Sequence, residues 1–359
     1  MISTPVTVVS ALASAARRGI LIKGGSFLEG ARKLRAIALD KTGTLTEGKP
    51  RLVEWIALTQ GANGADTAER DRIGRIAMSL VARSDHPVSQ AIAQGLALAA
   101  HPVEAFGAAA GRGTQGRIEG RDYVLGSHRL IEERGQCSPA IEAQLARHEQ
   151  QGRTVSLLAD AAGVIAIFAV ADTLRGGARQ AVAELLALGI TPVMLTGDNA
   201  ATARSIAAQA GIAEARGNLL PEDKLAEVRS LQARLGPTGM TGDGINDAPA
   251  LAQADIGFAM GAAGTDIAME AADVVVMNDD LGRIAETVRL SRRTHSVLVQ
   301  NIALALGIKA VFMALALFGS ATMWMAVFAD MGATLLVVAN GLRLLKTAVP
   351  GGGAASLRQ

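Results

Sequence analysis

The sequence predicts an α/β protein: a doubly wound parallel sheet with an inserted α+β domain, followed by a hairpin of two transmembrane helices. Short aliphatic runs of strand length alternate with helical patterns, and several of these runs end on an acidic turn. A long segment of different pattern separates the first run from the later ones. Two apolar stretches long enough to cross a bilayer follow the last run.

Composition limits the classes of function. The chain has 359 residues, enough for two or three domains, and 50% of them are hydrophobic. The mean hydropathy of +0.28 is high for a purely soluble protein. A net charge of +2 gives no electrostatic case for nucleic-acid binding. The single cysteine, Cys137, excludes a disulfide framework and any site with several cysteine ligands within this chain.

Residues 1–24 are predicted to form part of a transmembrane helix and a basic connector. The apolar run of residues 2–16 is too short to span a bilayer alone. Its positive charges, Arg17 and Arg18, follow the run, whereas a secretory signal carries them before it. A short amphipathic surface helix is the alternative.

Residues 25–48 predict the first part of the sheet domain. The run Ile37–Leu39 is typical of a buried strand that delivers Asp40 to the sheet edge, where open α/β sheets bind ligands. A carboxylate there can attack phosphorus and carry the phosphoryl group as an aspartyl-phosphate. On this stretch alone, an Asp in an ordinary strand-to-loop turn is an equal alternative.

Residues 49–153 predict the inserted domain. Helical periodicity runs from 73 to 98 and includes a His-Pro pair, and a hairpin pattern follows. A lone His is usually structural and a Gly-x-Gly is usually a turn, so these signals are weak by themselves. The motifs are Ser84-Asp85-His86-Pro87, Gly111-Arg112-Gly113 and Leu125-Gly126-Ser127.

The parallel sheet is expected to resume at residue 154 and to extend to 288. Strands are predicted at 155–158, 164–170 and 192–195, with a helix at 178–188. The chemistry-bearing motifs that follow are Thr196-Gly197-Asp198, Lys224 within Leu-Pro-Glu-Asp-Lys, and Gly242-Asp243-Gly244-Ile245-Asn246-Asp247.

In this order the motifs resemble those of the P-type ATPases, cation pumps with a haloacid dehalogenase-like phosphorylation domain. The signature Asp40-Lys41-Thr42-Gly43-Thr44-Leu45-Thr46 is highly specific to that family, and the resemblance runs from Ser3 to about Leu345. In the family, Ser3–Thr7 normally follows a Cys-Pro-Cys motif, which this sequence lacks together with the actuator domain. The resemblance therefore implies the C-terminal half of a pump, with the N-terminal half as an expected partner.

The resemblance also implies roles at the sheet edge. Asp40 would be the nucleophile, and Asp40, Asp243 and the Thr42 carbonyl would bind Mg²⁺. Lys224 would offset phosphate charge, while a solvated lysine is its alternative role. The supporting residues would be Thr196 and Asn246 as hydrogen-bond donors, Gly197 and Gly244 for close backbone approach, and Asp247 beside the metal, with a helix cap as its alternative role.

The inserted domain resembles the nucleotide-binding domain of the heavy-metal pumps, which implies ATP as cosubstrate. The family usually has a Glu five residues before the His, where this sequence has Val81, so adenine contacts are expected to be weaker or differently made. The ATP-binding candidates are His86, Gly111, Gly113, Gly126, Ser127, Thr42 and Asp198.

Residues 289–346 predict the transmembrane hairpin, with apolar runs at 296–318 and 323–345. Arginines before the first run and Arg343 and Lys346 at the end of the second place both flanks in the cytoplasm, with the catalytic domains. Away from its ends each run carries one charge, Lys309 in the first and Asp330 in the second, which is costly in a membrane. The Gly/Ala-rich tail, 347–359, is expected to be disordered.

The pattern of Lys309 followed by Asp330-Met331-Gly332 resembles the zinc, cadmium and lead exporters. Asp330 would bind the transported ion and Lys309 would act as its counter-charge. A carboxylate suits a borderline divalent ion better than Cu(I). An ion pair that locks the two helices is the structural alternative.

These patterns predict ATP-driven export of Zn²⁺, Cd²⁺ or Pb²⁺ across the plasma membrane through an aspartyl-phosphate at Asp40. Turnover by this chain alone is expected to be poor. The alternatives are a copper or cobalt pump, a soluble haloacid dehalogenase-like phosphatase, and an inactive remnant or binding subunit. The apolar spans, the insertion and Thr42, where such phosphatases commonly carry a second Asp, argue against the phosphatase. The intact set of Asp40, Lys224 and Asp243 argues against the remnant.

Overall fold

The structure is a computed structural model that describes residues 3–58, 67–109, 112–242, 244–261, 266–319 and 322–346. The predicted site residues Gly111 and Asp243 and the tail 347–359 lie outside these ranges. The chain divides into two compact units. One consists of residues 1–37, 184–191 and 228–359, and the other of residues 38–183 and 192–227.

Seven strands form the first sheet, in the order β1-β13-β12-β11-β2-β9-β10. Strands β11, β12 and β13 are parallel, as are β9 and β10, which confirms the predicted parallel α/β sheet. Strand β1 pairs antiparallel with β13 and was not predicted. The strands are β1 (Ile20–Ile22), β2 (Ala36–Asp40), β9 (Thr191–Leu195), β10 (Glu214–Arg216), β11 (Thr238–Gly242), β12 (Ile256–Met260) and β13 (Val274–Val276).

Helices alternate with these strands along the chain, as in other doubly wound sheets. All five residues of β2 are buried, as expected of a strand whose two faces are both covered. The helices are α2 (Gly25–Ala31), α7 (Ala178–Ala187), α8 (Ala200–Ala210), α9 (Pro221–Leu235), α10 (Ala248–Gln253) and α11 (Asp266–Ala271).

The second sheet has six antiparallel strands in the order β3-β8-β7-β6-β5-β4. The prediction that the strands at 155–158 and 164–170 belong to the parallel sheet is wrong, since they are β7 and β8 of this antiparallel sheet. The strands are β3 (Arg51–Ala57), β4 (Glu104–Ala109), β5 (Gly113–Ile118), β6 (Arg121–Ser127), β7 (Thr154–Ala159) and β8 (Val164–Ala171).

Burial on both faces explains why β7 and β8 imitate parallel strands in the sequence. Along β8, Phe168 and Val170 join one hydrophobic cluster, whereas Ile167 and Ala169 join another on the opposite face. Helices α3 (Thr67–Val81) and α4 (Pro87–Leu96) contribute to the first cluster, and α5 (His128–Glu133) and α6 (Pro139–Gln150) to the second. With both faces covered, the strands carry continuous apolar runs instead of alternation.

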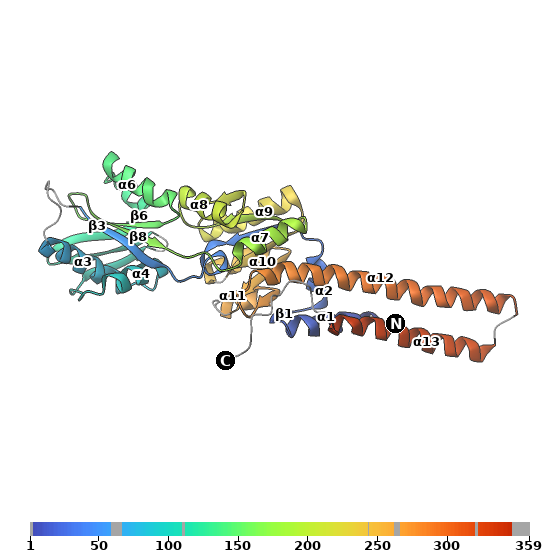
Figure 1. Ribbon diagram of the computed structural model, residues 1–359. Coiled ribbons are helices and arrows are strands. Elements are labelled where there is room, and N and C mark those ends of the chain that lie inside the picture. Colours follow the sequence, from blue (N-terminus) through green and yellow to red (C-terminus); the bar gives the residue numbers. More distant parts are fainter. Residues whose placement is uncertain are drawn as a thin grey trace. The chain divides into compact units, whose positions relative to one another are not determined.

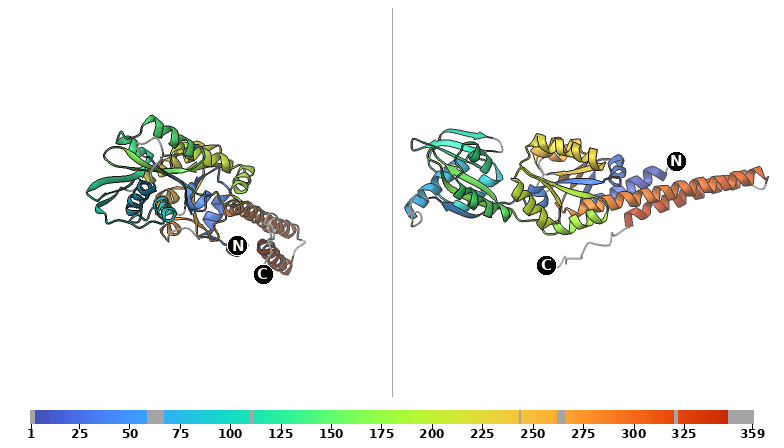
Figure 2. Two further views of the ribbon diagram at one scale, coloured as in Figure 1. Left: turned by 60° about the vertical axis from the view of Figure 1, so that its left-hand side comes forward. Right: turned by 90° about the horizontal axis from the view of Figure 1, so that it is seen from above.

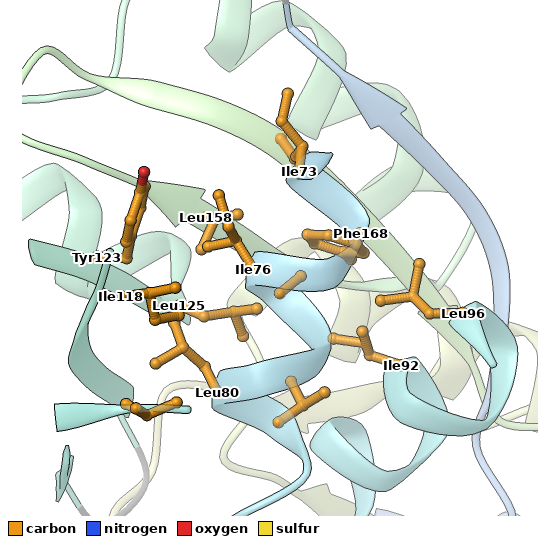
Figure 3. Packing of buried hydrophobic residues seen from close by; sticks show 14 of the residues in the cluster. Ile73, Ile76, Leu80, Ile92, Leu96, Ile118, Tyr123, Leu125, Leu158 and Phe168 are labelled. Carbon is orange, nitrogen blue, oxygen red and sulfur yellow. The ribbon is translucent and has the colours of Figure 1, made fainter. Parts of the chain in front are cut away.

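The larger cluster is formed by α3 and α4 against this sheet (Figure 3). Val81, at the position where the family usually has Glu, is 1% exposed and belongs to this core. The helical periodicity from 73 to 98 corresponds to two helices, α3 and α4, which are separated between Val81 and Pro87. Pro87 stands at the start of α4, and the His86 side chain caps that helix by accepting the Val88 N–H at 3.3 Å.

The C-terminal helices are α12 (Gly282–Leu317) and α13 (Met323–Leu342), an antiparallel pair with α1 (Ser3–Ala16) beside it (Figures 1 and 2). The start of α12 is buried, for example at Ile284 and Val288, whereas Leu306 and Leu317 further along are exposed. Within the described residues, two helices are long and apolar enough to cross a membrane, which confirms the two predicted apolar helices.

A buried polar network joins these three helices. Asn301 of α12 donates to Thr7 Oγ1 of α1 at 3.1 Å and accepts from Asn340 Nδ2 of α13 at 2.9 Å. Both Thr7 and Asn301 are almost fully buried. Hydrogen bonds of this kind are a common means of joining helices in an apolar environment.

Candidate active site at the end of strand β2

The centre of the candidate site is an ion pair between Asp40 and Lys224. Strand β2 ends at Asp40, which is 4% exposed, and Lys224 lies in the first turn of α9. Lys224 Nζ lies 2.5 Å from Asp40 Oδ1, although the residues are 184 positions apart in the sequence. Removal of one partner from a buried ion pair is strongly destabilising, because the charge that remains is buried without compensation.

The turn after Asp40 is held by three hydrogen bonds. Gly43 adopts a φ of 70°, which favours glycine. The Lys41 carbonyl accepts from both the backbone N–H and the Oγ1 of Thr46, each at 3.0 Å. Arg175 donates to the Gly43 carbonyl at 2.7 Å. The backbone that carries Thr42 is therefore fixed from both sides.

Lys41 and Asp198 form a second ion pair beside the turn. Burial would lower the pKa of the Lys41 ammonium, but the Asp198 carboxylate outweighs this effect and holds that pKa above its usual value. Asp198 also accepts from Thr154 Oγ1 at 3.2 Å, and its N–H donates to the buried Thr196 Oγ1 at 3.1 Å. The structure thus brings Thr196 and Asp198 together, with Asp198 engaged by Lys41.

Two chain segments, residues 47–49 and 172–173, connect this site with the six-stranded sheet. Asp172, at the end of β8, accepts from the backbone N–H groups of Gly48 and Lys49, both at 3.2 Å. The Glu47 N–H donates to the Thr173 carbonyl at 2.9 Å. Asp172, for which the sequence predicted no role, joins the segments that enter and leave the inserted sheet by hydrogen bonds.

The later acidic motif lies at the end of β11, in the other unit. Asp247 is buried, and its side chain packs directly on Gly242, where an added Cβ would lie 2.5 Å from the Asp247 Cβ. Asn246 is exposed and Gly244 is half-buried. Asp243 lies outside the described residues, so its role as a metal ligand stays a prediction.

Two glycines of the predicted nucleotide site lie opposite each other on neighbouring strands of the six-stranded sheet. Gly113 pairs with Gly126 between β5 and β6. A Cβ at Gly113 would lie 2.4 Å from the Leu125 carbonyl, and one at Gly126 would lie 2.8 Å from the Arg112 carbonyl. Ser127 accepts the Leu130 N–H and so caps α5.

His86 lies near the Lys41–Asp198 ion pair. Although His86 is exposed overall, its ring loses enough hydrating water to lower its pKa, an effect that Asp198 opposes and Lys41 reinforces. Because Nδ1 accepts the Val88 N–H, the ring proton belongs on Nε2.

Thr44 is a candidate that the sequence reasoning missed. Its side chain is fully buried, and its Oγ1 has no hydrogen-bond partner within the part of the chain that the structure describes. A buried hydroxyl without a partner is costly, which makes Thr44 Oγ1 a candidate donor to a group bound at this site. The sequence signal that could have identified Thr44 is its position as the second threonine of the signature that begins at Asp40.

The structure also brings the two predicted intramembrane charges together. Lys309 Nζ on α12 lies 3.4 Å from Asp330 Oδ1 on α13. Lys309 and Asp330 must lie close together in either of their two predicted roles, as parts of the transported-ion site or as a structural ion pair.

Substitution of Gly126 tests the glycine pair. Gly126→Ala is expected to weaken ATP binding to the full chain about tenfold, because the added methyl must displace the Arg112 carbonyl or Leu130 at a cost of about 1–3 kcal/mol. Isothermal titration with ATP measures this loss. Gly176→Ala is the matched control, since a Cβ there meets nothing within 4 Å. Equal affinities in the two variants would contradict the assignment.

The chain matches the haloacid dehalogenase-like hydrolase family over residues 34–255. It is 43% identical over 354 residues to a probable cadmium-transporting ATPase of Listeria monocytogenes. It is 38% identical over 352 residues to a cadmium, zinc and cobalt-transporting ATPase of Bacillus subtilis (strain 168), and 41% identical over 352 residues to a zinc/cadmium/lead-transporting P-type ATPase of Escherichia coli (strain K12). Each match covers 96% of this chain and 49%, 48% and 46% of the respective relative, so the chain spans about half the length of these relatives.

Solved structures that are similar to this chain include the following two. A zinc-transporting PIB-type ATPase in the E2.Pi state has a TM-score of 0.71 and 40% identity, and the match covers 96% of this chain and 55% of that one. The catalytic domain of a CPx-ATPase, studied for its conformational changes upon nucleotide binding, has a TM-score of 0.60 and 25% identity. That match covers 76% of this chain and 96% of that domain.

Proposed function

The chain belongs to the haloacid dehalogenase-like hydrolase family, and we propose that it is the catalytic half of a heavy-metal-exporting P-type ATPase. In this proposal ATP phosphorylates Asp40, and the aspartyl-phosphate drives a divalent cation through the membrane. The observation that carries the proposal is the buried contact between Lys224 and Asp40 at the end of β2.

The proposed reaction transfers one phosphoryl group. An oxygen of Asp40 attacks the γ-phosphorus, the bond from that phosphorus to the bridging oxygen breaks, and ADP leaves with the bonding electrons. Lys224 moves from the carboxylate to a phosphoryl oxygen, where its charge offsets the charge of the transition state. The hydroxyls of Thr196 and Thr44 and the Asn246 amide donate hydrogen bonds to the same group.

Asp40, the Thr42 carbonyl and Asp243 would hold Mg²⁺, which supplies further charge compensation. The two candidate ligands among the described residues are both hard oxygens at the end of β2, a donor set that fits this ion. The Asp40 carboxylate lies against one cation, the Lys224 ammonium. Asp247, whose side chain packs on Gly242, would support the metal site and its waters.

ATP would bind between the glycine pair and the Asp40 turn. Gly113 and Gly126 let the backbones of β5 and β6 pack closely on their neighbours, and Ser127 follows directly in the chain. His86 carries its proton on Nε2, and its ring is close enough to Lys41 and Asp198 to be influenced by their charges. Val81 is a core residue, so the adenine contact that the family's Glu provides has to come from another group.

The proposed cargo is Zn²⁺, Cd²⁺ or Pb²⁺, and the proposed location is the plasma membrane with the catalytic domains in the cytoplasm. The contact between Lys309 and Asp330 supports a carboxylate ligand with a built-in counter-charge. The similar Bacillus subtilis protein is a cadmium, zinc and cobalt-transporting ATPase, which keeps cobalt as a second candidate ion. The N-terminal half of such a pump is the expected partner for transport.

Asp330→Asn tests the choice of ion in a complete pump. We propose to join this chain to the N-terminal half of the E. coli relative and to measure ATP-dependent ⁶⁵Zn²⁺ uptake into inverted vesicles. Loss of a direct ligand is expected to reduce uptake by more than about 100-fold, because even groups that only support a ligand cost 10–100-fold. Met331→Leu, at the next and exposed position, is the control. Full uptake by Asp330→Asn would exclude Asp330 as a ligand.

A further inference from the structure

A cluster of side chains that commonly bind metals lies outside the proposed active site, beside the six-stranded sheet. His128 is the first residue of α5, Cys137 lies in the connection between α5 and α6, and Glu142 and Glu149 lie on α6. One ligand atom from each of His128, Cys137 and Glu142 lies within 4.8 Å of the other two. Nothing in the proposed reaction uses these residues.

The hydrogen bonds of His128 orient its ring. Nε2 lies 2.9 Å from Glu142 Oε1, and Nδ1 lies 3.2 Å from Glu149 Oε1. Histidines that bind metals almost always donate the other ring N–H to a carboxylate or carbonyl, which fixes the ring and makes it a better ligand. Glu149 stands in that position at Nδ1, while Nε2 lies against Glu142.

We propose that His128, Cys137 and Glu142 form a binding site for Zn²⁺ or Cd²⁺, with Glu149 as the carboxylate that orients the histidine. One thiolate, one imidazole and one carboxylate are the donor types that these borderline ions take, and the three donors leave a fourth position for water. All three side chains are half-buried, so a dissolved ion can reach them.

The geometry requires only small movements. Zn²⁺ binds nitrogen and oxygen at about 2.0–2.2 Å and sulfur at about 2.3 Å, so tetrahedral ligand atoms lie roughly 3.2–3.8 Å apart. The nitrogen and oxygen, now 2.9 Å apart, must therefore separate slightly, and the sulfur, which lies within 4.8 Å of both, must take a position in the same range. The His128 ring nitrogens lie against the carboxylate oxygens of Glu149 and Glu142, and a bound metal would replace the proton on Nε2.

The site also has a structural connection to the nucleotide candidates. His128 follows Gly126 and Ser127 directly, and Ser127 caps the helix that His128 begins. A metal ion would fix α5 to the connection and to α6 at the point where the chain leaves the glycine pair.

The site can be tested with CdCl₂ and the full chain in detergent. A bound thiolate gives an ultraviolet charge-transfer band with Cd²⁺, and Cys137 is the only cysteine of the chain, so the band can come from no other residue. We expect the band to saturate at about one Cd²⁺ per chain and to vanish in Cys137→Ser. His128→Gln and Glu142→Gln should each weaken binding about 10–100-fold.

Two controls separate this site from other metal binding. His101→Gln removes a partly exposed histidine elsewhere in the same sheet domain, and Asp330→Asn removes the proposed transport ligand. Both variants should keep the band and its midpoint. Equal midpoints in wild type, His128→Gln and Glu142→Gln would mean that Cys137 binds Cd²⁺ as an isolated thiol, which overturns the proposal.

X-ray absorption of the Zn²⁺-loaded wild-type chain provides a test that needs no variant. The proposal predicts one sulfur ligand at about 2.3 Å together with nitrogen or oxygen at about 2.0 Å. A spectrum without sulfur overturns the proposal, even if the variants fail to fold.

Discussion

Replacement of Asp40 by Asn is expected to abolish phosphorylation of the chain by ATP. The amide keeps the shape of the carboxylate but cannot attack phosphorus, and loss of a covalent nucleophile costs about 10⁶-fold in rate. Acid-stable incorporation of ³²P from γ-labelled ATP, with Mg²⁺ present, measures the effect. The label of the wild type should be released by hydroxylamine, which cleaves acyl phosphates.

The control for this experiment is Asp122→Asn, an exposed acid on β6 that pairs with Arg117. It should keep the full label. Because Asp40→Asn also removes the partner of Lys224 in the ion pair, thermal unfolding has to show that the variant is folded. A folded Asp40→Asn chain that still carries hydroxylamine-sensitive label would exclude Asp40 as the nucleophile.

Lys224→Gln is expected to slow phosphorylation about 10²–10³-fold, the range for loss of one group that stabilises developing charge. It also removes the cation that lies 2.5 Å from the Asp40 carboxylate, so folding stability should fall by up to about 3–5 kcal/mol. Rapid-quench labelling measures the rate, and denaturant unfolding measures the free energy of unfolding.

Two further variants separate the two effects. Lys224→Arg keeps the charge and is expected to recover stability better than rate, because the guanidinium has a different shape. In the double variant Asp40→Asn/Lys224→Gln the stability loss should be smaller than the sum of the single losses. Additive losses would mean that the ion pair does not couple the two residues.

The sequence predicted the centre of the site because its signals are specific. An aliphatic run that ends on the signature from Asp40 to Thr46 indicates both a strand end and a chemistry. Lys224 could be assigned only through the order of the motifs, since it lies 184 positions after Asp40 and nothing in the sequence between them shows that it reaches that residue. The apolar length of α12 and α13 predicted the hairpin, but not that α12 begins at Gly282 inside the buried part of its unit.

Other features could not be predicted because they depend on tertiary contacts. The pattern of β7 and β8 is the same for any strand buried on both faces, so it did not reveal the antiparallel sheet. Pro87 could have signalled the break between α3 and α4, but the apolar periodicity continues past it. The unpartnered hydroxyl of Thr44 and the approach of His128 to Glu149 are visible only when the chain is folded.

The most direct test of the account is the position of the phosphoryl group. Borohydride reduces an acyl phosphate to an alcohol, so an aspartyl-phosphate becomes a homoserine side chain that peptide mass spectrometry can locate. After ATP, Mg²⁺ and acid quench, the account predicts homoserine at position 40 and only in samples that received ATP. Homoserine at another position, or none in a chain that carries the ³²P label, would contradict it.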